Sequence, residues 1–175
     1  DLTSLGTFYG SATLTSNVPV VAMVNLQTDG SLLCYKGFAG GATPGSGEIF
    51  TGLLYKHIQS YGYDYNSAIM VKDVSGSGST VRVKYYPSSG IPSQYPGGSP
   101  WSYDITLSPG EMRSIDQRYD MSITTGTYYG TASLEALSGE IVAISNIRAT
   151  GTYQPVSSVA VGGSSVTKVA VPVVY

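Results

Sequence analysis

Residues Gly126-Thr127-Tyr128-Tyr129-Gly130-Thr131-Ala132-Ser133-Leu134 decide the fold of this 175-residue chain, because nearly the same nine residues occur earlier in it. The earlier copy reads Gly6-Thr7-Phe8-Tyr9-Gly10-Ser11-Ala12-Thr13-Leu14, with Phe for one Tyr and exchanges between Ser and Thr. In both copies small or apolar residues alternate with polar ones, a pattern typical of a strand with one buried face. We therefore predict strands at residues 7–14 and 126–134.

The similarity between the two parts of the chain continues beyond these strands. Residues 21–26 correspond to 142–147, and Leu53-Leu54-Tyr55 corresponds to Val173-Val174-Tyr175, always at a spacing of about 120 residues. This spacing predicts about one and a half copies of a repeated unit. We expect residues 1–45 to be the C-terminal part of a preceding unit and 46–150 a complete unit. Residues 151–175 would be a linker and the first strand of a following unit.

Composition excludes several classes of protein. Charged residues make up 11% of the chain, against roughly 25% in an ordinary soluble domain. Hydrophobic residues make up 42%, which disfavours disorder. The net charge is −2 and the basic residues are scattered, so we expect no nucleic-acid partner. No apolar run approaches the length of a membrane span. Because the chain opens on Asp1, we expect a processed protein or an excerpt.

Short alternating segments separated by turn residues predict an all-β fold. Seven strands are expected in the complete unit, at residues 48–57, 61–73, 80–86, 101–107, 112–115, 126–134 and 140–147, with further strands at 20–26 and 32–38. Ser108-Pro109-Gly110-Glu111 fits a type II turn. The predicted core comprises Val81, Val83, Tyr85, Tyr103, Ile105, Leu107, Tyr128, Ala132 and Leu134, with Arg82, Lys84, Asp104 and Tyr129 more exposed. The pattern favours an antiparallel β-sandwich of Ig-like architecture.

The order of these elements resembles the tandem Ig-like β-sandwich repeats of large bacterial extracellular surface and stalk proteins. The shared features are an alternating strand ending in two tyrosines, a strand that opens with Trp, a Pro-Gly turn, a Tyr-Gly-Thr-Ala strand and an apolar strand closing on Asn, here Tyr85-Tyr86, Trp101, Pro109-Gly110, residues 129–132 and Asn146. The resemblance spans most of residues 48–150. It implies an extracellular, non-catalytic, structural role.

No pattern in the sequence marks an active site or a metal site. His57 is the only histidine, and no Gly-x-Ser-x-Gly elbow accompanies it. The aspartates form no Asp-x-Asp-x-Asp run that would predict a calcium loop, although Asp64, Asp73, Asp104, Asp116 and Asp120 are present. Cys34 is the only cysteine and is expected to be a small buried side chain. We therefore predict no enzyme and no cofactor.

Aromatic residues provide the best candidate surface. Tyr61, Tyr63 and Tyr65 recur with period two, so in one strand their rings would share a face. Together with Tyr95 and Trp101 they could form a platform for sugar rings, or pack at a contact between repeats or subunits, which we favour. Asn25 and Asn146 occupy matching places in the two copies and are expected to be amides at strand ends.

The C-terminal residues form a candidate strand-exchange segment. Val169, Val171, Val173 and Tyr175 alternate with other residues and would make an apolar face on a strand with unpaired edges. Our leading hypothesis is a structural repeat of an extracellular filament, stalk or cell-surface array, whose partners are other copies or neighbouring repeats. A carbohydrate-binding or adhesive module is the alternative, which would bring glycans as partners. A viral coat or fibre protein is the third possibility.

Overall fold

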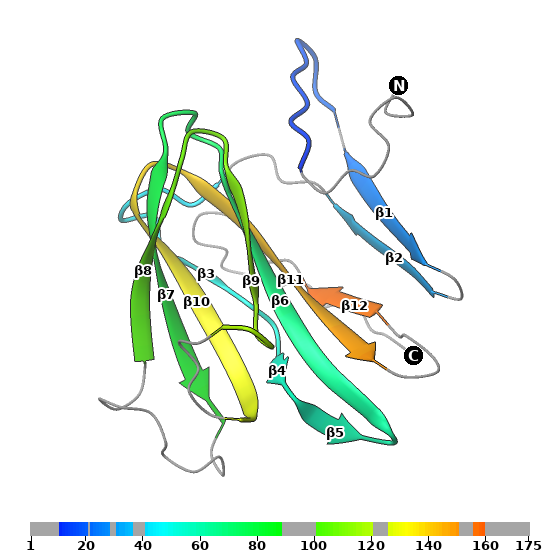
Figure 1. Ribbon diagram of the computed structural model, residues 1–175. Helices are drawn as coiled ribbons and strands as arrows, with labels where there is room; N and C mark the ends of the chain where they lie inside the picture. Colours follow the sequence, from blue (N-terminus) through cyan, green and yellow to red (C-terminus); the bar gives the residue numbers. More distant parts are fainter. Residues whose placement is uncertain are drawn as a thin grey trace.

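A computed structural model of the chain describes residues 11–20, 22–28, 31–36, 41–88, 101–120, 126–150 and 156–159. These residues form antiparallel strands and no helix (Figure 1). In particular, no helix that is long and apolar enough to cross a membrane occurs among them.

One sheet is organised around β10 and is called the β10 sheet below. On one side β10 (Tyr128–Ser138) pairs along its length with β7 (Ser79–Pro87), which pairs in turn with β8 (Trp101–Leu107). On its other side β10 pairs with two short strands, β3 (Glu48–Phe50) and β4 (Leu54–Lys56). The stretch that is repeated in the sequence is therefore the central strand of this sheet.

The second sheet is organised around β6 and is called the β6 sheet. β6 (Tyr63–Asp73) pairs with β11 (Ile141–Thr150), and β11 pairs with the short strand β12 (Val156–Val159). The other side of β6 is shared by β5 (Ile58–Ser60) and β9 (Met112–Asp116). A separate hairpin of β1 (Met23–Thr28) and β2 (Ser31–Lys36) lies next to β12 (Figure 1).

The two sheets pack face to face over a single apolar core, as in a β-sandwich. The predicted register of β7 is confirmed, since Val81, Val83 and Tyr85 are buried between the sheets. The other predicted core residues that are fully buried are Leu107, Tyr128, Ala132 and Leu134. Tyr103 and Ile105 are only half-buried, because β8 is an edge strand. Asp104 is exposed, whereas Arg82, Lys84 and Tyr129 are intermediate.

The predicted strand at 48–57 is wrong in its continuity, because the chain breaks it twice. At Thr51 the side-chain Oγ1, rather than a main-chain oxygen, accepts the amide N–H of Ala132 at 2.8 Å. At His57 the backbone takes a left-handed φ of 49°, which turns the chain out of the β10 sheet after β4 and into the β6 sheet as β5. The described residues between Glu48 and Thr150 thus form nine strands, β3 to β11, where seven were predicted.

Four other predicted strand boundaries shift because cross-strand pairing, rather than local pattern, sets where strands end. β6 begins at Tyr63, since Tyr61 and Gly62 both have positive φ and form the two-residue turn of the β5–β6 hairpin. β11 extends to Thr150, which pairs with Asp64. β10 is displaced, from 126–134 to Tyr128–Ser138. Residues 11–14, inside the predicted strand 7–14, form no strand.

Two connections between the strands are worth noting. The type II turn at 108–111 is confirmed by the Glu111 N–H that donates to the Ser108 carbonyl at 2.9 Å and by the φ of 72° at Gly110. Ala42, predicted to belong to the segment before the complete unit, instead pairs with Ile141 by two main-chain hydrogen bonds and is buried in the core. The sandwich therefore recruits residues that precede position 46.

Candidate functional site

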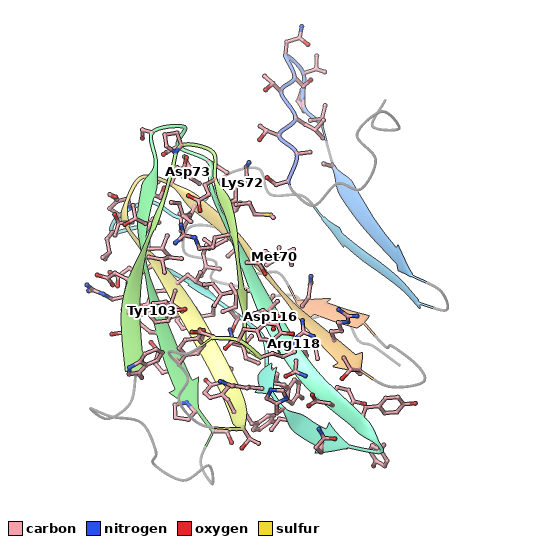
Figure 2. The ribbon with its side chains drawn as sticks, in the orientation of Figure 1. Met70, Lys72, Asp73, Tyr103, Asp116 and Arg118 are labelled. Carbon is pink, nitrogen blue, oxygen red and sulfur yellow. The ribbon has the colours of Figure 1, made fainter. Side chains whose placement is uncertain are left out.

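Asp73 organises the loop end of the sandwich, where Figure 2 shows it. Its buried carboxylate accepts hydrogen bonds from the hydroxyls of Ser75 and Ser79 and from the main-chain amides of Gly76 and Gly110. Burial alone would raise the pKa of Asp73, but these four donors outweigh it and hold the pKa well below its ordinary value. The carboxylate is therefore saturated by loops of the protein itself, which makes it a structural clamp.

A polar centre lies inside the sandwich around Asp120. The hydroxyls of Tyr85 and Tyr103 donate to its Oδ2 at 2.9 and 3.0 Å, and the Lys56 ammonium donates to its main-chain oxygen at 3.2 Å. Gln117 donates its amide N–H to Tyr85 Oη at 3.0 Å, while its buried Oε1 has no partner among the described residues. Burial lowers the pKa of Lys56, with partial compensation from the Asp120 charge, and raises the pKa of Tyr85.

Trp101 belongs to this internal cluster rather than to a surface platform. Its ring stacks on Tyr85 with centroids 5.6 Å apart and an interplanar angle of 17°, and it contacts Tyr103 at 5.2 Å. Tyr128 meets Tyr85 edge-on at 5.7 Å. The predicted grouping of Trp101 with the 61–65 tyrosines is therefore not formed, because β8 and β6 belong to different sheets.

The structure brings together a different set of rings, which we call the tyrosine row: Tyr63, Tyr65, Tyr55 and Tyr129. Successive ring centroids along the row lie 6.2, 6.2 and 5.4 Å apart. Tyr63 and Tyr65 share a face of β6, as their period-two spacing predicts. Tyr61 does not join them, since it lies in the β5–β6 turn and is 94% exposed. Sequence reasoning missed Tyr55 and Tyr129 because β4 and β10 reach the row only through sheet pairing.

His57 lies close to the row and is fixed by neighbours on β6. Its Nδ1 is 3.0 Å from Asp64 Oδ2, and its main-chain N–H donates to Asn66 Oδ1 at 2.9 Å. Asn66 in turn donates to Asp64 Oδ2 at 3.0 Å. This network holds the left-handed turn at which the chain changes sheet. No group of three or more His, Cys, Asp or Glu side chains suited to a metal ion occurs in the described part of the chain.

The outward face of the β10 sheet carries paired charges. Arg82 forms a bidentate pair with Asp104 at 2.8 and 3.0 Å. Lys84 bridges Glu48 and Glu135, and its pKa rises because both carboxylates accept hydrogen bonds from it. On the β6 sheet Asp116 pairs with Arg118, as Figure 2 shows. These charges are satisfied locally, so none of them forms an anion- or cation-binding patch.

Residues 11–14 show the sharpest contrast between sequence and environment. They correspond to residues 131–134 of β10, yet they form no strand and all four are exposed. Leu14 is 72% exposed, whereas Leu134 is fully buried. Downstream, Val18 and Val20 are each 60% exposed. A single side-chain contact, from the Lys72 ammonium to Ser11 Oγ at 2.8 Å, joins residues 11–14 to the sandwich within the described residues.

Several predicted positions are placed only in part. Tyr95 and the strand-exchange residues Val169, Val171, Val173 and Tyr175 lie outside the described residues. Cys34 lies on β2 and Asn25 on β1. Asn146 lies within β11 opposite Ala68, not at a strand end, because β11 continues to Thr150; its buried Oδ1 has no partner among the described residues.

Comparison with known proteins identifies a fold but no family. No family model and no curated protein matches the sequence. The crystal structure of Thermotoga maritima 1070 is similar, with a TM-score of 0.51 and 10% sequence identity, over 71% of this chain and 96% of that chain. At this identity the likeness supports the all-β architecture alone.

Proposed function

We propose that the chain is a non-catalytic structural segment of an extracellular filament, stalk or cell-surface array, built from tandem Ig-like β-sandwich units. In this proposal residues 46–150, together with Ala42, make up one unit. The preceding residues are the end of another unit, and residues 151–175 begin a third. The units associate through β-strand contacts.

The observation that carries the proposal is the fate of the repeated strand. Leu134 is buried at the centre of the β10 sheet, while the matching Leu14 is exposed without a sheet around it. A sequence that alternates like a sheet strand but has no sheet exposes main-chain hydrogen-bonding groups and apolar side chains. Such a segment is stabilised when strands of another body pair with it.

Two further features agree with this proposal. The similar solved structure matches 71% of this 175-residue chain, or about 124 residues, which is close to the repeat spacing. The β1–β2 hairpin, at the position in the first copy that β11 and β12 occupy in the second, is likewise an antiparallel pair of consecutive strands. Both features support a division of the chain into similar units.

The tyrosine row fits a contact surface better than a sugar platform. Its neighbouring rings are inclined to one another by 69°, 51° and 36°, so they do not present one flat aromatic face. Rings packed in this way provide large apolar area with polar tips, which suits a protein contact. The few charges on the chain also leave little repulsion between copies.

Electron microscopy and analytical ultracentrifugation of the purified chain test the proposal. We expect elongated assemblies that grow with protein concentration. Because the outward charges are already paired within the sandwich, raising the salt concentration should change assembly little. A chain that stays monomeric at every concentration would rule out self-association, and binding of a glycan abolished by Tyr65→Ala would favour the adhesive module instead.

A further inference from the structure

Within the sandwich, the strands that flank β10 have a second version in the sequence, just as β10 does. Residues 169–175 correspond to residues 49–55, which include parts of β3 and β4, at the same spacing of about 120 that relates residues 6–14 to 126–134. The sequence therefore contains a second β10-like segment and a second β3–β4-like segment. The structure shows how the first versions of these segments pair.

From this correspondence we infer that residues 169–175 of one copy of the chain pair, antiparallel, with residues 9–14 of a second copy. The inference rests on the proposed function and specifies its partner: the tail of one copy takes the place that β3 and β4 hold beside β10. The acceptor is the segment whose described residues, 11–14, are exposed and form no strand.

The pairing inside the sandwich specifies the register of the pairing between copies. Leu134 is opposite Ile49, Ser133 opposite Phe50, and Tyr129 opposite Tyr55. The corresponding pairs are Leu14 with Val169, Thr13 with Ala170, and Tyr9 with Tyr175. Leu14 and Val169 would then take the inward positions that Leu134 and Ile49 occupy, both of which are buried in the sandwich.

Two local features of the segments suit this register. Gly130 is required in β10, because a Cβ there would meet the carbonyl oxygen of Tyr86 and the ring of Tyr128; the first copy keeps glycine at the matching position, Gly10. The strand break at Gly52, between β3 and β4, corresponds to Pro172. Proline has no N–H to donate to a sheet, so the tail carries its own break at the same place.

The pairing completes one side of the acceptor strand. β10 is flanked by β3 and β4 on one side and by β7 on the other, and the repeated segments supply only the first side. We therefore expect a contact that forms and dissociates with concentration rather than a permanent one. Because each copy has one tail and one acceptor, the contact is head-to-tail and can extend a row of copies.

Chains with a single cysteine test this register. The Thr13 and Ala170 pair corresponds to Ser133 and Phe50, which directly follow the hydrogen bond from the Thr51 N–H to the Ala132 carbonyl. Ser133 and Phe50 thus form a non-hydrogen-bonded pair, whose short Cα separation of about 4.5 Å permits a disulfide. Thr13→Cys and Ala170→Cys are made on separate chains that also carry Cys34→Ser, and the two chains are mixed under mild oxidation.

The expected result is a disulfide-linked dimer containing one chain of each kind, identified by mass. The matched control mixes Thr13→Cys with Val169→Cys, whose side chain points to the opposite face of the tail strand; this dimer should form at least several-fold more slowly. Equal rates for the two mixtures, or no mixed dimer, would overturn the inferred pairing. Filaments without the mixed dimer would leave the proposed function standing and the pairing wrong, whereas a mixed dimer without longer assemblies would confirm the pairing and contradict the filament.

Discussion

At the scale of single residues, Asp73 shows how a polar group can be fully buried without a charged partner. The donors that compensate its charge come from the loop at 75–79 and from the turn at 108–111, so one side chain ties two connections to the end of β6. Hydrogen bonds to a charged group contribute more than those between neutral groups, about 1.5–3 kcal/mol each. The stability of this end of the sandwich therefore depends on the carboxylate more than on the loop sequences.

Replacing Asp73 by Asn should reduce the free energy of unfolding by about 3 kcal/mol at neutral pH, because donors that lose the carboxylate stay buried. Chemical denaturation measures the change. Asp104→Asn is the matched control, since Asp104 is exposed and pairs with Arg82 at the surface, where such pairs contribute about 0–1 kcal/mol. Equal losses for the two variants would contradict the clamp.

The contribution of Asp73 should also depend on pH in a defined direction. Its folded-state pKa lies below the unfolded value of about 3.9. Its stabilisation is therefore fully present above about pH 5 and is lost as the pH falls toward the folded-state pKa. The difference in unfolding free energy between the natural chain and Asp73→Asn should shrink between pH 7 and about pH 3. A difference that stays constant or grows on acidification would be inconsistent with this sign.

Gly130 supplies a second prediction at this scale. Gly130→Ala should cost about 1–3 kcal/mol, because the new methyl group has no room beside the Tyr86 carbonyl and the Tyr128 ring. Gly126→Ala, where no neighbouring atom lies within 4 Å of the new methyl group, should change stability little. Thermal unfolding of both variants gives the comparison, and a neutral Gly130→Ala would mean that the ring moves away freely.

At the scale of elements, β10 and its sequence counterpart behave differently because only one of them has neighbours. β10 is central and pairs on both sides, whereas residues 11–14 have no strand beside them in the described part of the chain. A strand gains little from its own conformational preference, since most of its stabilisation comes from packing and cross-strand contacts. The same sequence can therefore be a core strand in one place and an exposed segment in another.

Truncating the two matching leucines tests this difference directly. Leu134→Ala should lower the free energy of unfolding by about 2–5 kcal/mol, because it opens a cavity in a close-packed core. Leu14→Ala should change it by less than about 0.5 kcal/mol in dilute solution, where Leu14 faces solvent. Urea unfolding curves at low protein concentration measure both. A large loss for Leu14→Ala would show that residues 11–14 pack against the sandwich in solution.

At the scale of the whole molecule, stability and assembly should be separable. The apolar core of the sandwich draws on Ala42 and on strands from β3 to β11, and residues 11–20 contribute no buried side chain to it. The exposed apolar side chains at 14, 18 and 20 lie outside this core and are available for contacts between copies.

Deleting residues 1–20 should therefore leave the unfolding transition of the sandwich within about 0.5 kcal/mol of the full chain. The same deletion should abolish the growth of assemblies with concentration, because it removes the segment that we propose is completed by another copy. Unfolding and sedimentation are measured on the same preparation. Assemblies that persist after the deletion would assign the contact to another surface, of which the tyrosine row is the strongest candidate.

The sequence by itself determined the strands whose environment is symmetrical along their length. The alternation in β7 predicts which side chains are buried, and Pro109-Gly110 predicts the turn between β8 and β9, because both depend on interactions within a few residues. The repeat likewise identified the segment that forms the central strand of one sheet.

Only the tertiary structure decided which aromatic residues meet and where the chain changes sheet. Trp101 faces the core beside Tyr85, while Tyr55 joins the tyrosine row, because strand pairing brings together positions far apart in sequence. The left-handed turn at His57 depends on Asn66, nine residues away. Leu14 and Leu134 occupy matching sequences yet differ completely in burial, since burial requires neighbouring strands that a local pattern can anticipate but cannot supply.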